Sequence, residues 1–151
     1  MPPAIGFVFD QEGKTSEEQA DIIRRTGPTV SFLPRRMYEN YLMDAGAVSR
    51  ALISLDSEHA DQYTVERVGA SLEAECQKGE NFRPFPGSGD AWRNTIHAAK
   101  VLKAVFGTMS EHRVRYDKVR DGEALTKDII ANSPGQLGEL SQFLLGLLPE
   151  G

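Results

Sequence analysis

The chain has 151 residues, of which 40% are hydrophobic and 26% are charged, values typical of one globular domain rather than a disordered chain. Its single cysteine excludes an internal disulfide, and the lack of a Cys/His cluster argues against structural zinc, so the sequence favours a cytoplasmic protein. The lack of a long apolar run or a basic leader argues against a membrane protein, and the net charge of −5 argues against binding nucleic acid through bulk charge.

The N-terminal third has the pattern strand, helix, strand. Ala4–Phe9 is a short apolar run rich in β-forming residues and predicts a buried strand. A helix is predicted over Ser16–Arg25, and Thr29–Leu33 predicts a second strand. This unit implies a parallel sheet with a right-handed crossover, and ligands usually bind at the carboxyl ends of such strands. The helix residues expected to face inward are Ala20, Ile22 and Ile23.

The remainder of the chain predicts mostly helices. A long helix is expected over Ala60–Lys78, with Gly79 as its C-cap, and a strongly amphipathic helix over Ala91–Phe106. Phe82–Gly89 between them is an irregular connection, and a short extended segment is expected around Val114–Val119. The fold class is α/β, with a small parallel sheet first and a mostly helical C-terminal two-thirds, in a single domain covering 1–151. The other predicted helices are Met37–Leu42, Ala47–Ser54, Ala124–Ala131 and Pro134–Leu148.

Three acidic residues follow the two predicted strands. Asp10 and Glu12 come directly after the first strand, and Glu39 follows the second. Carboxylates that meet at one end of a parallel sheet would present hard oxygen ligands suited to Mg²⁺ or Mn²⁺. The alternative is structural: acids at strand ends are common turn formers, and Glu39 would pair with Arg35 or Arg36 on a short amphipathic helix.

Basic residues are concentrated in the C-terminal half. The Arg93–Lys127 region carries eight Lys/Arg against four Asp/Glu, so it could meet the phosphates of a nucleic acid or simply form a solvated helix face. Within it, Lys100 could stabilise negative charge on a transferred phosphoryl group, although a lone lysine on such a helix is usually just solvated. His97 has no second metal-type ligand at helical spacing and is expected to be an ordinary residue of the helix face.

The segments IGFVFDQEG, VSFLPRRMYENYL and IHAAKVLKAVF, in this order, carry a family resemblance. Together they resemble the Toprim domains of the OLD family, in particular the related Toprim-like domains found beside ABC-type ATPases in bacterial defence systems. The ENYL segment after LPRR is the most specific part. The tail, Tyr116-Asp117-Lys118-Val119 followed by ALTKDIIANSPGQLGELSQFLLGLL, also resembles the C-termini of these proteins.

The resemblance implies a metal-dependent nuclease domain. Asp10, Glu12 and Glu39 would correspond to metal-binding acids, with Glu39 also catalytic, and Lys100 would correspond to the basic catalytic residue. Divalent Mg²⁺ or Mn²⁺ would be the cofactor and DNA or RNA the substrate. The chain departs from the family pattern in three places: Glu12 replaces an Asp, two alanines separate His97 from Lys100, and an earlier strand that supplies a further Glu is missing.

These departures indicate which parts of a Toprim protein the chain is expected to lack. It resembles the latter part of a Toprim domain, without the N-terminal strand and without an ATPase region, since no GxxxxGK[ST] motif is present. An ATPase, a complementing chain or a second copy is therefore the expected partner. The alternative functions are a noncatalytic interaction module of a defence or mobile-element system, and a small phosphate-binding α/β protein of unrelated ancestry.

Overall fold

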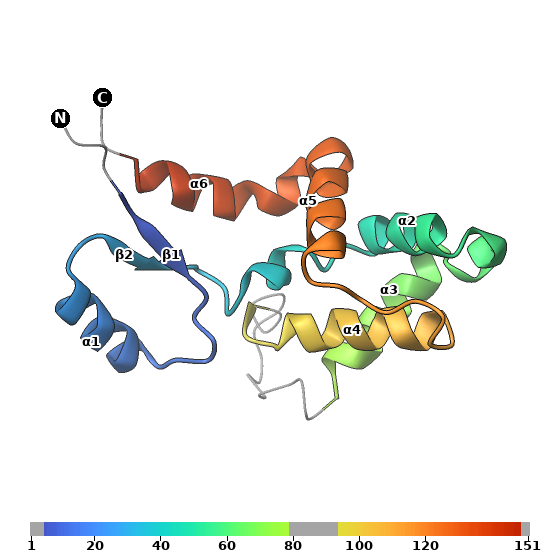
Figure 1. Cartoon of the computed structure of the whole chain (residues 1–151), viewed down its shortest axis with the longest axis horizontal. Coiled ribbons are helices and arrows are strands. Elements are labelled where there is room, and N and C mark those ends of the chain that lie inside the picture. The colour runs from blue at the N-terminus through green and yellow to red at the C-terminus, as the bar shows by residue number, and fades with distance from the viewer. Residues whose placement is uncertain (1–4, 79–93, 149–151) are drawn as a thin grey trace.

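The computed structural model describes residues 5–78 and 94–148. The small sheet and its crossover helix form one end of the molecule, and a body of packed helices forms the other (Figure 1). The segment that follows the second strand connects these two parts, and the last helix, α6, runs back from the helical body toward the sheet (Figure 1). The predicted α/β class is confirmed, with a small parallel sheet first and mostly helices afterwards.

The sheet and crossover helix form as the sequence predicts. Strand β1 (Phe7–Phe9) pairs in parallel with β2 (Val30–Phe32), with Phe7 opposite Val30. Helix α1 (Ser16–Thr26) begins at a capping box, in which the Thr15 hydroxyl accepts from the Glu18 amide and the Glu18 carboxylate accepts from the Thr15 amide. Gly27, at φ 84°, ends the helix in a conformation that suits glycine.

The prediction that the first strand is buried is wrong. Phe7, Val8 and Phe9 are 54%, 38% and 49% exposed, and α1 has no buried residue. Of the residues expected to face inward, Ala20 and Ile23 are exposed and Ile22 is half-buried. The sequence carries the apolar pattern of a covered sheet, but the described part of the chain pairs just one edge of β1 and leaves its faces open.

The hydrophobic core lies in the helical body. Helices α2 (Ala45–Leu55), α3 (Val65–Cys76), α4 (Ala98–Met109) and α5 (Arg120–Asn132) surround it. Its largest fully buried side chains include Tyr63, Phe106 and Leu102, each with no exposed surface. In this half of the chain the apolar residues at helical spacing are buried, as amphipathic helices require.

Several helix boundaries differ from the prediction. The long helix expected over 60–78 divides into a 3₁₀ helix, η2 (Ser57–Gln62), and α3, because the Thr64 hydroxyl caps a new helix start by accepting from the Arg67 amide. The helix expected from Ala91 begins instead at Ala98, and no strand forms around 114–119. Gly79, Phe82–Gly89 and Trp92 lie outside the described residues.

The remaining elements are 3₁₀ helices η1 (Tyr38–Tyr41) and η4 (Pro134–Leu137) and helix α6 (Gly138–Gly146). Within residues 5–78 and 94–148, no helix has the length and apolar character needed to cross a bilayer.

A polar cluster fastens η2 to the turn after α4. The Asp56 carboxylate accepts hydrogen bonds from the Tyr63 hydroxyl and from Arg113 Nε, the latter at 3.0 Å, and its other oxygen lies 2.8 Å from His59 Nδ1. The hydrogen bond from Tyr63, followed by those from His59 and Arg113, lowers the pKa of Asp56 to about 2.

We expect this cluster to make stability fall at acid pH. Because the pKa of Asp56 is depressed in the folded state, its stabilising contribution is present at neutral pH and is lost as the pH falls from about 4 towards about 2. Asp56→Asn should lower the melting temperature at neutral pH and reduce its fall over this acid range. Thermal melts of both proteins across the range test this; parallel curves would contradict it.

Candidate functional site

Three segments distant in sequence meet beside the carboxyl ends of the strands. The loop after β1 meets the segment after β2, because the Tyr38 amide donates to Asp10 Oδ1 at 3.0 Å and the Glu12 amide donates to the carbonyl of Arg36 at 3.1 Å. The start of α4 joins them, since Asn40 Nδ2 donates to the carbonyl of Ile96 at 3.2 Å. The structure therefore places the neighbourhoods of Asp10, Glu12 and Glu39 together.

Glu39 is the most unusual of these acids, because its carboxyl group is almost completely buried, with only 1% exposed. Lys118 Nζ lies 3.1 Å from its Oε1, an ion pair with poor hydrogen-bond geometry. Neither Glu39 oxygen has a well-formed hydrogen bond among the described residues. Removing a carboxylate from water costs several kcal/mol unless a cation and hydrogen bonds compensate it, so this site has a strong demand for positive charge.

The predicted structural alternative for Glu39 does not describe its surroundings. Arg35 Nε lies 3.2 Å from Glu139, and the Arg35 guanidinium sits 4.3 Å from the ring centre of Tyr41, so this arginine is engaged on the side of α6. The cation at Glu39 is Lys118, which comes from the loop before α5. No spacing in the sequence indicates this contact, because the two residues lie far apart in the chain.

Asp10 and Glu12 occupy different positions on the rim. Asp10 is half-buried and uses Oδ1 to hold the backbone of η1. Glu12 is 69% exposed in its side chain, lies 3.5 Å from Lys14 Nζ and has a left-handed backbone with φ 48°. The contact with Glu39 first, and then the charges of Asp10 and Glu12, raise the pKa of Lys118, so all three acids act on one ammonium group.

The acids do not form a ready metal site. Within the described ranges, no group of three or more His, Cys, Asp or Glu side chains is close enough to hold a metal ion. The donor chemistry is nevertheless suited to a hard cation, and the buried Glu39 oxygens have no hydrogen-bond partner among the described residues. Glu39 and Asp10 thus fit part of a metal shell, whereas Glu12 would have to turn inward from solvent.

A cavity of about 330 Å³ adjoins Glu39. Tyr116 lines this cavity, and its hydroxyl is buried and has no hydrogen-bond partner in the described structure. Burial first, and then the negative charge of Glu39, raises the pKa of Tyr116, so the phenol stays protonated and can donate. The cavity is lined by Tyr38, Glu39, Leu42, Tyr116, Lys118, Gly122, Glu123, Thr126 and Lys127.

Lys100 and His97 lie at the N-terminus of α4. His97 Nδ1 accepts from the Lys100 amide at 3.4 Å and so caps the helix, a position that differs from the expected helix face. Burial, followed by the charges of Arg36 and Lys100, lowers the pKa of His97, while Glu39 opposes this. Lys100 is exposed and makes no ion pair with another described residue, which leaves its ammonium available to an anion.

Much of the basic region is neutralised internally. Arg113, Lys118, Arg120 and Lys127 each pair with a carboxylate. In the part of the chain that the structure describes, Lys100, Lys103 and Arg115 have no such partner, and Arg93 lies outside that part. The surface available to a polyanion is therefore smaller than the residue count predicts.

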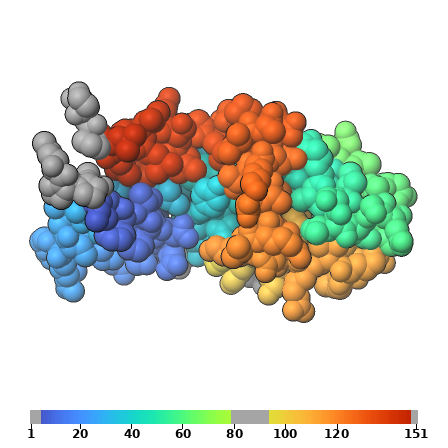
Figure 2. Space-filling view, turned by 45° about the horizontal axis from the view of Figure 1, so that its top comes forward, coloured from blue at the N-terminus to red at the C-terminus, as the bar shows by residue number. Residues whose placement is uncertain are grey.

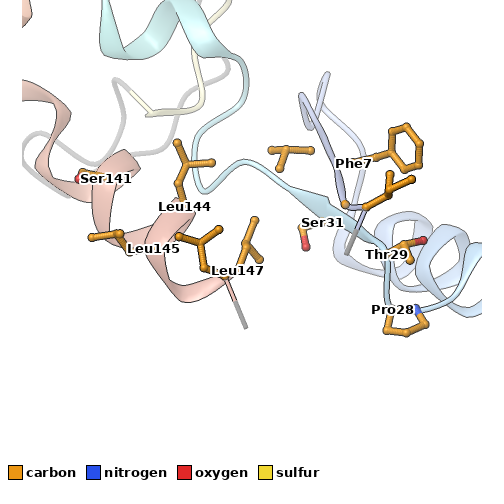
Figure 3. A pocket seen from close by; sticks show the side chains of 12 residues that line it. Phe7, Pro28, Thr29, Ser31, Ser141, Leu144, Leu145 and Leu147 are labelled. Carbon is orange, nitrogen blue, oxygen red and sulfur yellow. The ribbon is translucent and has the colours of Figure 1, made fainter. Parts of the chain in front are cut away.

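A separate apolar groove of about 690 Å³ lies between the sheet and α6. Phe7, Thr29 and Ser31 line it on the strand side, and Leu144, Leu145 and Leu147 of the α6 end line it opposite (Figure 3). In the space-filling view the sheet and α6 lie side by side on the surface (Figure 2). Leu145 is 63% exposed and Phe7 is 54% exposed, so this groove is open to solvent.

No family model, curated protein or solved structure matches this chain. The assignment of function therefore depends on the residues and geometry described above. Sequence reasoning identified Asp10, Glu12, Glu39 and Lys100, but it did not identify Lys118 or Tyr116 as site residues. Both lie in the Tyr116-Asp117-Lys118-Val119 segment, which contributed to the family resemblance without suggesting a role.

Proposed function

We propose that this chain is a Toprim-like, metal-dependent nuclease domain or a degenerate relative of one, acting on nucleic-acid phosphodiesters. The observation that carries the proposal is Glu39, a carboxylate that is 1% exposed, has no well-formed hydrogen bond in the described structure and lies beside the loop of Asp10. A buried acid at the carboxyl end of a parallel strand is a suitable cation ligand.

Different residues of this region would bind the metal ion and the nucleic acid. Glu39 and the Oδ2 atom of Asp10 would hold a Mg²⁺ or Mn²⁺ ion, and Glu12 would complete the shell by turning in from solvent. When bound, the cation would supply activation of water and stabilisation of the leaving oxygen. Lys100, at the N-terminus of α4, would stabilise charge on the phosphoryl group, and the unpaired cations of this region would contact the nucleic-acid backbone.

Metal binding gives the first test of this function. Millimolar Mn²⁺ should raise the melting temperature of the wild-type chain, because a ligand that binds the folded state stabilises it. Asp10→Ala and Glu39→Gln should each abolish that shift. Glu17→Gln, on the exposed face of α1, is the matched control and should keep it. A wild-type chain that shows no shift would indicate that the acidic rim is structural.

Cleavage gives the second test. Plasmid, single-stranded DNA and RNA incubated with Mn²⁺ or Mg²⁺ should be cut slowly or not at all by the chain alone, because few carboxylates are available and the net charge is −5. Any cleavage should disappear in Asp10→Ala. Rapid metal-dependent cleavage by a monomer would show that the chain needs no partner.

The exposed sheet favours a second candidate function, that of an interaction module. Within the described residues one edge of the apolar β1 strand has no partner strand, and the strand adjoins the open groove at α6. Exposed edges of this kind usually pair with another strand. We propose a second copy of this chain as the occupant, because the backbone groups of Val8 at this edge can pair with those of another Val8.

A further inference from the structure

The ion pair at Glu39 joins two very different side chains. Glu39 is held in η1 with 1% of its side chain exposed, whereas the Lys118 side chain is 67% exposed. An exposed lysine is a flexible, strongly hydrated cation, so the cost of separating this pair lies in the uncompensated carboxylate and not in the lysine. The buried carboxylate cannot leave, so it requires another cation whenever Lys118 moves away.

The surroundings of this ion pair can accommodate another cation. The adjoining cavity of about 330 Å³ exceeds by severalfold the ~30 Å³ share of one water molecule, so a partly hydrated ion would fit. Tyr116 lines the same cavity, and its buried hydroxyl has no hydrogen-bond partner in the described structure. Glu39 and Tyr116, which both line this cavity, therefore have buried polar atoms without a hydrogen bond among the described residues.

We infer that Lys118 is a built-in counter-ion of Glu39, and that a divalent cation enters the site by exchanging with the Lys118 ammonium. This inference rests on the proposed function, since it assumes that the acidic rim binds metal. It adds a regulatory step, because metal affinity is set by competition with a residue of the chain itself. The geometry supports this competition, because the Lys118 ammonium lies 3.1 Å from Glu39 Oε1 and so occupies the position next to the buried carboxylate.

The first test compares two lysines of the same cavity. Lys118→Met should lower the dissociation constant for Mn²⁺ about tenfold, because it removes both the competing contact and the charge repulsion. Lys127→Met is the matched control: its ammonium also lines the cavity and is 72% exposed, but it pairs with Glu123 at 2.5 Å. Lys127→Met should leave the Mn²⁺ affinity within about twofold of wild type, since a charge that does not occupy the Glu39 site is largely screened. Equal affinities of the Lys118→Met and Lys127→Met proteins would overturn the inference.

A second measurement uses the wild-type protein and covers the case in which Lys118→Met does not fold. Amine acetylation, followed residue by residue with mass spectrometry, should be slow at Lys118 without metal and several-fold faster with saturating Mn²⁺, because the exchange releases the ammonium. Acetylation of Lys127 should not change. Protection of Lys118 that persists at saturating Mn²⁺ would contradict exchange.

The outcomes separate this inference from the proposed function. Tighter Mn²⁺ binding by Lys118→Met, together with nucleic-acid cleavage that persists in Asp10→Ala, would support the exchange and refute cleavage at the acidic rim. Mn²⁺-dependent cleavage with unchanged affinity in Lys118→Met would support the nuclease and refute the exchange.

Discussion

Replacing Phe106 with alanine should lower the free energy of unfolding by about 3–5 kcal/mol, the usual cost of truncating a fully buried phenylalanine. Phe106 has no exposed surface and lies at the centre of the helical core. Its ring also packs edge-on against Tyr116, with ring centres 5.2 Å apart, so the substitution should loosen one wall of the cavity beside Glu39. Because small domains are stable by about 5–15 kcal/mol, this loss could leave a substantial unfolded fraction.

Urea denaturation followed by circular dichroism measures this effect, and Phe7→Ala is the matched control. Phe7 undergoes the same chemical change but is 54% exposed in β1, so the cost should stay below about 1 kcal/mol. A Phe7→Ala variant that loses as much stability as Phe106→Ala would show that the sheet is part of the cooperative core.

The secondary structure could be predicted from the sequence because its signals are local. Thr15 with Glu18 starts α1, Gly27 ends it, and Ser133 followed by Pro134 precedes the last helices. The sequence predicts one helix over 60–78 because the apolar spacing continues across Thr64. In the structure the Thr64 side chain caps the start of a separate helix, α3. Local patterns thus predict the type of an element better than its boundaries.

Burial could not be predicted for the N-terminal unit. The run of apolar residues at β1 indicates a strand with both faces covered, yet in the described structure Phe7 and Phe9 are about half exposed, at 54% and 49%. A continuous run of apolar residues in a strand indicates that both of its faces are covered in the functional protein, and other chains can supply the covering surfaces. The helical body shows the opposite case, because there the chain itself supplies the facing surfaces.

The candidate site, too, could be predicted from the sequence only in part. Strand positions predicted that Asp10, Glu12 and Glu39 would be neighbours, because parallel strands end at one edge. The burial of Glu39 and its pairing with Lys118 depend on how the loop before α5 packs against η1, a long-range contact without a sequence period. Tertiary packing thus determines which lysine reaches the acid.

We expect the chain to form a dimer in which two β1 strands pair. In the described structure β1 pairs only with β2, so its other edge is open. The Phe7 amide donates to the carbonyl of Thr29 and the Leu33 amide donates to the carbonyl of Phe9, so the backbone groups of Phe7 and Phe9 face β2. The amide and carbonyl of Val8, between them, therefore point to the open edge. If two copies meet about a two-fold axis at Val8, each Val8 can exchange both hydrogen bonds with the other, because an antiparallel pair on such an axis is self-complementary.

This pairing would also cover apolar surface on both faces of the strand, where Phe7, Val8 and Phe9 are now exposed. Val8→Pro should convert the dimer to a monomer, since proline removes the Val8 amide donor but leaves the hydrogen bonds to β2 in place. Val8→Ala is the matched control, because it keeps the amide and should remain dimeric at tens of micromolar protein, roughly the range where a weak interface of this size assembles. Light scattering after size-exclusion chromatography gives the masses. A wild-type chain that is monomeric at that concentration would exclude a second copy as the occupant and indicate that a different polypeptide covers this edge.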